Sequence, residues 1–216
     1  MLVRLVRHGE SEGNFAGSLQ GSRLDTPLSE TGRRQAQALA EHLAGSGIDA
    51  VWASPMLRAR ETADAVAKVV GLGVSLDPDL VEFDWGAWSG RPYDGEIEKE
   101  VSGVRARWRA GEIDLAPQGG ESPARAALRA DRFLARLRAS GAKAPLVVAH
   151  GRFNRILITR LLGRPLSKMD EIRQRNGSLS VFDWDGAAPA EALLLDDISH
   201  QPPEIRNVSV LSDSAR

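Results

Sequence analysis

The sequence predicts an α/β protein in which a mostly parallel central sheet lies between two layers of helices. Two observations carry this prediction. Short β-branched apolar runs alternate along the chain with segments of helical periodicity, and the two clearest runs both end in His-Gly. A chain of 216 residues with 42% hydrophobic and 26% charged residues is long enough to bury one large core. We therefore expect one domain over residues 1–200 and a C-terminal tail over 201–216.

The first half of the chain contains two strand–helix units. Strands are predicted where β-branched residues form short runs, as in LVRLV near the N-terminus. Helices are predicted where apolar residues recur at helical spacing between a capping Ser or Pro and a closing Gly. In order, the predicted elements are a strand over 2–6, a helix from Ser29 to about Gly45, a strand over 48–54, a helix from Pro55 to Gly71 and an extended piece over 73–80.

The second half begins with a segment of a different character. Residues 91–120 are polar and punctuated by Gly and Pro around one weak helix, which predicts an excursion outside the core that covers the site. APLVVAHG is the clearest strand of the chain. The remaining predicted elements are a helix over 125–137, a strand over 144–151, a helix over 152–162, and strands over 179–184 and 192–195 joined by a turn at Asp185–Gly186. We expect the tail from Pro202 onwards to be loosely held.

Composition excludes several classes of protein. The net charge of -1 does not favour a nucleic-acid or membrane-surface protein. The chain has no cysteine, which excludes disulfides, thiolate zinc sites and cysteine nucleophiles. No apolar run approaches the roughly 18 residues of a membrane span, and Arg4 interrupts the short apolar N-terminus. We expect a cytoplasmic protein that binds neither nucleic acid nor membranes, and the sequence leaves open whether it forms a homodimer.

Two predicted strands end in the same way, with VRHG at Val6–Gly9 and VAHG at Val148–Gly151. Sites in parallel sheets form at the carboxyl ends of strands, so His8 and His150 should face one crevice if both strands are central. HExxH, GxSxG, GxxxxGK and GxGxxG motifs are all absent from the sequence. Cations beside an imidazole can hold a phosphate while a ring nitrogen attacks it, and they keep that ring neutral. Phosphoryl transfer is therefore the chemistry that this pattern favours.

Seven segments in a fixed order carry a resemblance to a known family. They are RHGESEGN (Arg7–Asn14), LDTPLSETG (Leu24–Gly32), SPMLRARETA (Ser54–Ala63), LVEFDWGAWSG (Leu80–Gly90), PQGGES (Pro117–Ser122), VVAHG (Val147–Gly151) and DDISH (Asp196–His200). The chain resembles the histidine phosphatase superfamily, in the branch that includes cofactor-dependent phosphoglycerate mutases. The resemblance extends from Leu5 to about His200, and it implies a phosphoglycerate mutase-like fold of three α/β/α layers.

The resemblance also implies roles for individual residues. His8 would attack phosphorus and become a phosphohistidine, and Glu82 would protonate the leaving oxygen before helping water to attack. The expected catalytic residues are His8, Glu82, His150, Arg7 and Arg58. The expected substrate-binding residues are Arg7, Gly9, Asn14, Arg58, His150, Gly151 and Arg152. Neither a metal nor an organic cofactor is expected, and the expected partner is a phosphorylated small molecule.

Arg152 departs from the family pattern, which commonly has a small or neutral residue after His-Gly. Two interpretations stay open: a cation facing solvent, or an additional group that binds a second acidic group of the substrate.

The residues around Glu82 distinguish two outcomes of phosphohistidine chemistry: hydrolysis by water and transfer to a second substrate hydroxyl. In mutases of the branch the segment around the acid resembles E-R-x-Y-G. Here Phe83 follows Glu82, and Trp85 stands at the tyrosine position. The paired arginines that bind bisphosphoglycerate in the mutases are not evident in residues 91–120. We therefore expect a phosphomonoesterase, with a cofactor-dependent phosphoglycerate mutase as the alternative and a non-catalytic phospho-ligand-binding module as a third. The sequence does not distinguish sugar phosphates, phosphoglycerate derivatives and ribazole-type phosphates as substrates.

Overall fold

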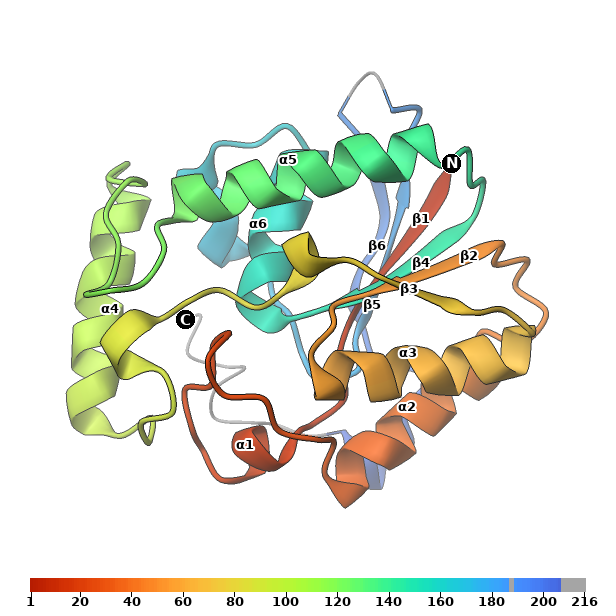
Figure 1. Ribbon diagram of the computed structural model, residues 1–216, viewed down its shortest axis with the longest axis horizontal. Helices are drawn as coiled ribbons and strands as arrows, with labels where there is room; N and C mark the ends of the chain where they lie inside the picture. The colour runs from red at the N-terminus through yellow and green to blue at the C-terminus, as the bar shows by residue number, and fades with distance from the viewer. Residues whose placement is uncertain (187–188, 207–216) are drawn as a thin grey trace.

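The structure, a computed structural model, describes residues 1–206 apart from 187–188. Its centre is a six-stranded sheet with the strand order β3-β2-β4-β1-β5-β6 (Figure 1). The strands are β1 (Leu2–Arg7), β2 (Ala50–Ala53), β3 (Val74–Leu76), β4 (Pro145–Ala149), β5 (Leu179–Asp183) and β6 (Glu191–Asp197). β5 pairs antiparallel with both of its neighbours, and the other pairings are parallel. The predicted mostly parallel sheet is confirmed.

Helices cover both faces of this sheet. α2 (Glu30–His42) and α3 (Leu57–Val70) lie on one face, and α5 (Pro123–Ala139) and α6 (Gly151–Leu161) lie on the other. Two further α-helices of the described residues, α1 (Glu12–Phe15) and α4 (Gly95–Arg109), lie outside these two layers (Figure 1). On β1, Val3 and Leu5 belong to the core cluster that includes α5 and α6, whereas Val6 belongs to the cluster of α2 and α3. Side chains alternate across a strand, so these two clusters lie on opposite faces. The predicted three-layer α/β/α architecture is confirmed.

Most predicted helix boundaries have a local cause that the structure reveals. Ser29 caps α2 by accepting a hydrogen bond from the backbone N–H of Gly32 at 3.0 Å. Gly71 ends α3 with a left-handed φ of 73°. Pro55 differs from expectation: α3 begins at Leu57 with Met56 as its N-cap, so the proline precedes the helix rather than occupying its first turn.

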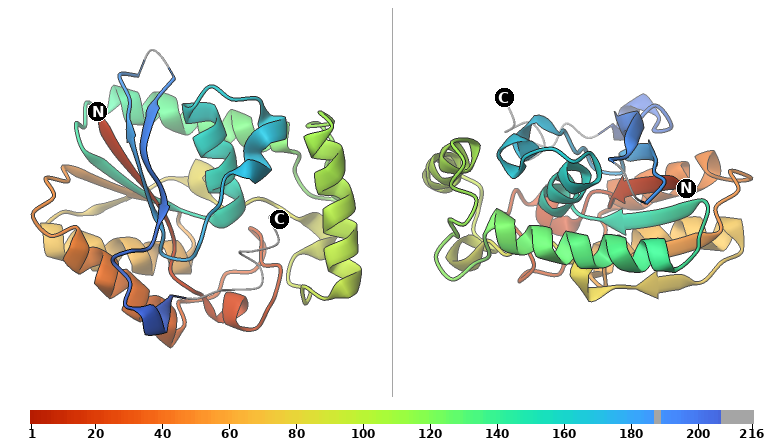
Figure 2. Two further views of the ribbon diagram at one scale, coloured as in Figure 1. Left: turned by 180° about the vertical axis from the view of Figure 1, so that it is seen from behind. Right: turned by 90° about the horizontal axis from the view of Figure 1, so that it is seen from above.

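The prediction that residues 91–120 lie outside the core is wrong for α4. Ile97, Val101 and Trp108 are at most 2% exposed and belong to the same core cluster as Phe83 and Trp85. These three positions share one face of a helix, and the abundant charges between them obscured that pattern. Figure 2 shows α4 at the opposite end of the molecule from the N-terminus. β1 runs from the N-terminus toward this end and β4 is parallel to it, so the carboxyl ends of both strands point toward the side of α4. The short helix α1 was not predicted.

The start of the tail is held more firmly than the sequence suggested. Ile205 is 3% exposed, and its carbonyl accepts a hydrogen bond from Nε2 of Gln35 on α2 at 2.8 Å. The remainder of the predicted loose tail, 207–216, lies outside the described residues. None of the helices in the described ranges is both long and apolar enough to cross a membrane.

Two glycines hold the loop after β1 directly against α2. A Cβ on Gly32 would lie 1.8 Å from the carbonyl oxygen of Glu10, and a Cβ on Gly9 would lie 2.5 Å from that of Gly32. Backbone atoms cannot move aside as a flexible side chain does. The close approach of these two segments fixes the path of the chain immediately after His8.

Gly32→Ala is expected to lower the free energy of unfolding by about 2 kcal/mol or more, because the added methyl group overpacks the contact between two backbones. Urea unfolding followed by circular dichroism measures this change. Gly103→Ala is the matched control: it lies inside α4, a Cβ there meets no atom within 4 Å, and alanine should raise stability by about 0.5–1 kcal/mol. Equal stabilities of Gly32→Ala and the wild type would contradict the tight contact.

Candidate active site

His8 and His150 meet because β1 and β4 are adjacent, parallel and in register. Arg7 pairs with Ala149 across the two strands, and the backbone N–H of His8 donates to the carbonyl of Ala149 at 3.0 Å. The two imidazole rings lie edge to face with their centroids 5.1 Å apart. The prediction that the two His-Gly strand ends lie side by side at one edge of the sheet is confirmed, but His8 lines the cavity described below and His150 does not.

The contacts of the His8 imidazole fix the positions of both ring nitrogens. Its Nδ1 lies 2.6 Å from the carbonyl oxygen of Gly9, and a carbonyl only accepts, so Nδ1 carries the proton. Nε2 is then unprotonated, and it accepts a hydrogen bond from Nε of Arg58 at 3.2 Å. Burial together with the charges of Arg58 and Arg7 holds the pKa of His8 well below its ordinary value. The result is a neutral ring with its lone pair beside a guanidinium group.

Arg7 and Arg58 are two cations close to the His8 ring. Arg58 is 1% exposed, and its Nη2 donates to the carbonyl of Gly21 at 3.1 Å. Nη1 of Arg7 donates to the carbonyl of Gln174 at 2.6 Å, whereas its buried Nε has no hydrogen-bond partner among the described residues. Burial lowers the pKa of Arg7 to about 10, so the group is still charged at neutral pH. A buried charge with an unused donor is costly to maintain unless an anion binds beside it.

Gly151 allows Arg7 to adopt this position. It is the first residue of α6, and a Cβ there would lie 3.1 Å from Nε of Arg7. The guanidinium group therefore packs flat against the glycine at the N-terminus of a helix, an end that itself favours negative charge.

Glu82 is placed at the same helix N-terminus. Its Oε1 accepts hydrogen bonds from the backbone N–H groups of Phe83 at 2.7 Å and Phe153 at 2.9 Å. Its Oε2 accepts from the backbone N–H of Arg152 at 3.2 Å. These bonds fix the orientation of the carboxyl group at the edge of the cavity, in the direction of Arg7 and Arg58, which both interact with its charge.

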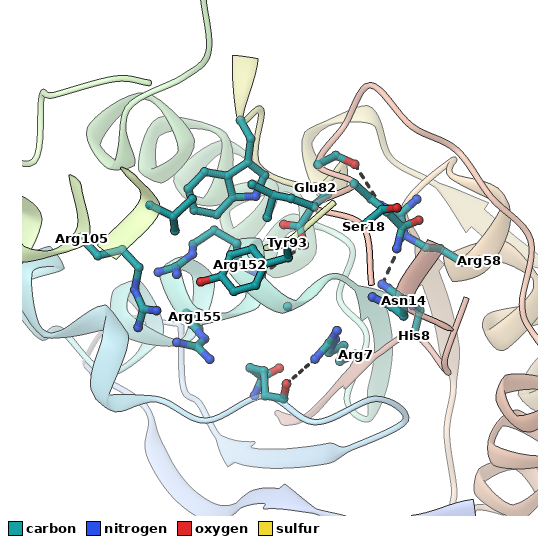
Figure 3. A pocket seen from close by; sticks show the side chains of 17 residues that line it. Arg7, His8, Asn14, Ser18, Arg58, Glu82, Tyr93, Arg105, Arg152 and Arg155 are labelled. Atoms are coloured by element: carbon teal, nitrogen blue, oxygen red, sulfur yellow. Dashed lines mark hydrogen bonds between the residues drawn. The ribbon is translucent and has the colours of Figure 1, made fainter. Parts of the chain in front are cut away.

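One cavity collects most of the predicted residues. Arg7, His8, Asn14, Arg58, Glu82, Gly151 and Arg152 all line it (Figure 3). The Oδ1 atom of Asn14 accepts from the backbone N–H of Ser11 in a capping box, so its amide NH2 group is the part available to a ligand. No group of three or more His, Asp or Glu side chains within the described residues is placed to hold a metal ion.

Two predicted site residues lie behind the cavity wall instead. His150 is fully buried, and its Nε2 lies 2.8 Å from Oγ of Ser54. Burial and the nearby Arg58 hold its pKa well below the ordinary value. The backbone N–H of Gly9 donates to Oγ1 of Thr62 at 3.1 Å, and Gly9 itself packs on α2. In this structure these residues support His8 and do not contact the cavity.

Sequence reasoning missed two arginines on the far wall of the cavity. Arg105 extends from α4 and Arg155 from α6, and both line the cavity together with Arg152. Figure 3 shows His8 and Arg58 at one end of the cavity and Arg105 and Arg155 at the other. In the sequence each of these arginines resembles an ordinary charged residue of a solvated helix. Their burial depends on how α4 and α6 each pack against the short 3-10 helix Leu166–Glu171, which no local motif reveals.

The profile of the histidine phosphatase superfamily (branch 1) matches residues 3–197. The chain belongs to this superfamily. This histidine phosphatase is 37% identical over 179 residues to phosphoserine phosphatase 1 of Hydrogenobacter thermophilus. The alignment covers 82% of this chain and 84% of that protein. It is 36% identical over 191 residues to a protein named probable phosphoglycerate mutase GpmB from Photorhabdus laumondii, with 84% of each chain covered.

A solved structure shows the same fold. The mycobacterial glucosyl-3-phosphoglycerate phosphatase in complex with VO3 superposes on this histidine phosphatase with a TM-score of 0.80 at 31% sequence identity. The superposition covers 90% of this chain and 98% of that chain. The family resemblance that was identified from seven sequence segments is thus confirmed, as is the expected class of phosphoric monoester hydrolase.

Proposed function

We propose that this histidine phosphatase hydrolyses small phosphomonoesters through a phosphohistidine on His8. The observation that carries the proposal is the pair of contacts that His8 makes: Nδ1 lies 2.6 Å from the carbonyl oxygen of Gly9, and Nε2 accepts a hydrogen bond from Nε of Arg58 at 3.2 Å. A phosphate that enters the cavity replaces Nε2 as the acceptor of the Arg58 donor. The lone pair of Nε2 is then free to attack phosphorus.

The reaction needs two displacements at phosphorus. In the first, Nε2 of His8 forms a bond to phosphorus, the bond to the ester oxygen breaks, and that oxygen takes a proton from Glu82. In the second, Glu82 takes a proton from water as its oxygen attacks phosphorus, and the bond to Nε2 breaks to release inorganic phosphate. Arg7 and Arg58 neutralise the charge on the three equatorial oxygens in both steps. His150 positions the ring of His8 from behind the cavity.

Hydrolysis is favoured over transfer to a second substrate hydroxyl. Glu82 is followed by Phe83, whose side chain is fully buried in the core, instead of an arginine that would face the substrate. Two relatives named as phosphatases, one acting on phosphoserine and one on glucosyl-3-phosphoglycerate, support the same choice. The relative named as a probable phosphoglycerate mutase makes transfer the second candidate.

Purified protein is expected to release p-nitrophenolate from p-nitrophenyl phosphate without an added metal ion and in the presence of a chelator. Incubation with 3-phosphoglycerate, with and without bisphosphoglycerate, then separates the two outcomes. Release of inorganic phosphate in both incubations supports a phosphatase. Formation of 2-phosphoglycerate that depends on bisphosphoglycerate identifies a mutase, and failure to turn over either compound or a panel of metabolite phosphates would overturn the proposal.

A further inference from the structure

Four arginines surround a single buried carboxylate at the end of the cavity far from His8. Asp170 is 7% exposed and interacts with Nε of Arg105 at 3.0 Å, Nη1 of Arg109 at 3.4 Å and Nη1 of Arg155 at 3.6 Å. It also forms a direct ion pair with Arg152. These neighbouring charges hold the pKa of Asp170 well below its usual range, against the effect of burial, so the group is ionised.

The positive charge of this cluster exceeds the negative charge of Asp170. Arg152 and Arg155 alone carry two charges, and the one carboxylate that they share also interacts with Arg105 and Arg109. A cluster built only to stabilise the fold would have matching charges, because an uncompensated buried charge is costly. An anion from outside the cluster would supply the missing charge.

Arg155 shows most directly that the cluster lacks negative charge. It is 6% exposed and lines the cavity, yet its buried Nη1 has no hydrogen-bond partner among the described residues. Burial, followed by the charge of Arg152, lowers the pKa of Arg155 to about 9. A nearby anion would relieve both the desolvation of this group and the repulsion from its neighbour.

Arg152 is held rigidly instead of facing solvent. Its side chain is 9% exposed and is fixed between Asp170 and the rings of Trp85 and Trp108, whose centroids lie 5.4 and 5.7 Å from its Cζ. Of the two interpretations that the sequence left open for Arg152, that of a solvent-facing cation is therefore wrong. A pre-oriented guanidinium group loses little entropy when it binds an anion.

We propose that Arg105, Arg152 and Arg155 form a second anion site, which binds a carboxylate or a second phosphate on the same substrate whose reacting phosphate lies at His8. Asp170 is a positioning residue that orients the three guanidinium groups. This inference rests on the proposed phosphatase function and narrows it to phosphomonoesters that carry an additional anionic group. The separation of the two groups of cations along one cavity, visible in Figure 3, matches a substrate that is charged at both ends.

A matched pair of ligands tests the proposal. 3-Phosphoglycerate and glycerol 3-phosphate share a three-carbon skeleton and differ in a carboxylate against a hydroxymethyl group. Both are titrated by calorimetry into the His8→Ala protein, which cannot turn them over, and both are used as inhibitors of p-nitrophenyl phosphate hydrolysis by the wild type. We expect the carboxylate to strengthen binding by about tenfold or more, which is typical of a hydrogen-bonded ion pair.

Arg152→Met and Arg155→Met, introduced singly, are expected to reduce this preference to within about threefold. Each change removes a charge but keeps much of the side-chain volume. Arg160→Met is the control: it lies on the same helix, is 40% exposed and pairs with Asp131 away from the cavity, so the preference should persist. Circular dichroism confirms that each variant is folded. Arg152→Lys keeps the positive charge and should retain part of the preference that Arg152→Met loses.

The two possible failures are distinguishable. Equal affinities for 3-phosphoglycerate and glycerol 3-phosphate in a protein with all three arginines intact overturn the second anion site, even if the wild type hydrolyses p-nitrophenyl phosphate. A preference that survives in both the Arg152 and Arg155 variants overturns it as well. Conversely, preferential binding of 3-phosphoglycerate in calorimetry without hydrolysis of any phosphoester supports the anion site and contradicts the phosphatase function.

Discussion

His8→Ala is expected to lower kcat for p-nitrophenyl phosphate by about 10⁴-fold or more, because the variant has no nitrogen that can accept the phosphoryl group. The arginines of the site are unchanged in this variant, so it should bind inorganic phosphate while it fails to hydrolyse esters. The substitution also leaves Nε of Arg58 without its acceptor, which removes a contact of 3.2 Å but no part of either core cluster.

Rapid quenching of a reaction with a labelled phosphoester measures the intermediate directly. The wild type should yield acid-labile, alkali-stable label on the protein, and His8→Ala should yield none. His42→Ala is the control, since His42 is exposed on α2, where it stacks on His200 with ring centroids 5.5 Å apart. Retention of a tenth of the wild-type activity by His8→Ala, or equal labelling of both proteins, would contradict the mechanism.

The central part of the site was predictable because its signals are local. Each His-Gly follows a short apolar run, and parallel strands that are buried on both faces have that sequence character. Placing His8 beside His150 then needed only the assumption that both strands are central. Family motifs added Arg58 and Glu82, which come from different elements and have no sequence pattern of their own.

The rest of the site depends on packing that no single segment encodes. Arg105 and Arg155 are separated by 50 positions in the sequence and converge only because α4 and α6 pack around Asp170. Because residues 91–120 were interpreted as a polar excursion, the position of Arg105 beside Asp170 was not predicted. The apolar residues of α4 are too widely spaced to stand out among its charges. Gly9 also had a different explanation, because the close approach that it permits is to Gly32 and not to a ligand.

Glu82→Gln is expected to separate substrates by their leaving group. The alkoxide of an alkyl phosphate needs a proton as its bond to phosphorus breaks, whereas p-nitrophenolate is stable without one. The substitution should therefore lower kcat by about 10²–10⁴-fold on an alkyl phosphate that the wild type hydrolyses, and lower the phosphorylation rate much less on p-nitrophenyl phosphate. Burst kinetics measure that rate separately from hydrolysis of the phosphohistidine, the step for which we propose Glu82 as the base.

The comparison with Asp84→Asn makes this test specific to position 82. Asp84 lies two residues away and is also acidic, but it pairs with Arg23 at 2.8 Å outside the residues that line the cavity. Its substitution should leave the ratio of rates on the two substrates unchanged, whereas Glu82→Gln should change that ratio by at least about tenfold. Equal losses on both substrates in Glu82→Gln would mean that Glu82 only holds the N-terminus of α6 through the N–H groups of Arg152 and Phe153, and that another group donates the proton.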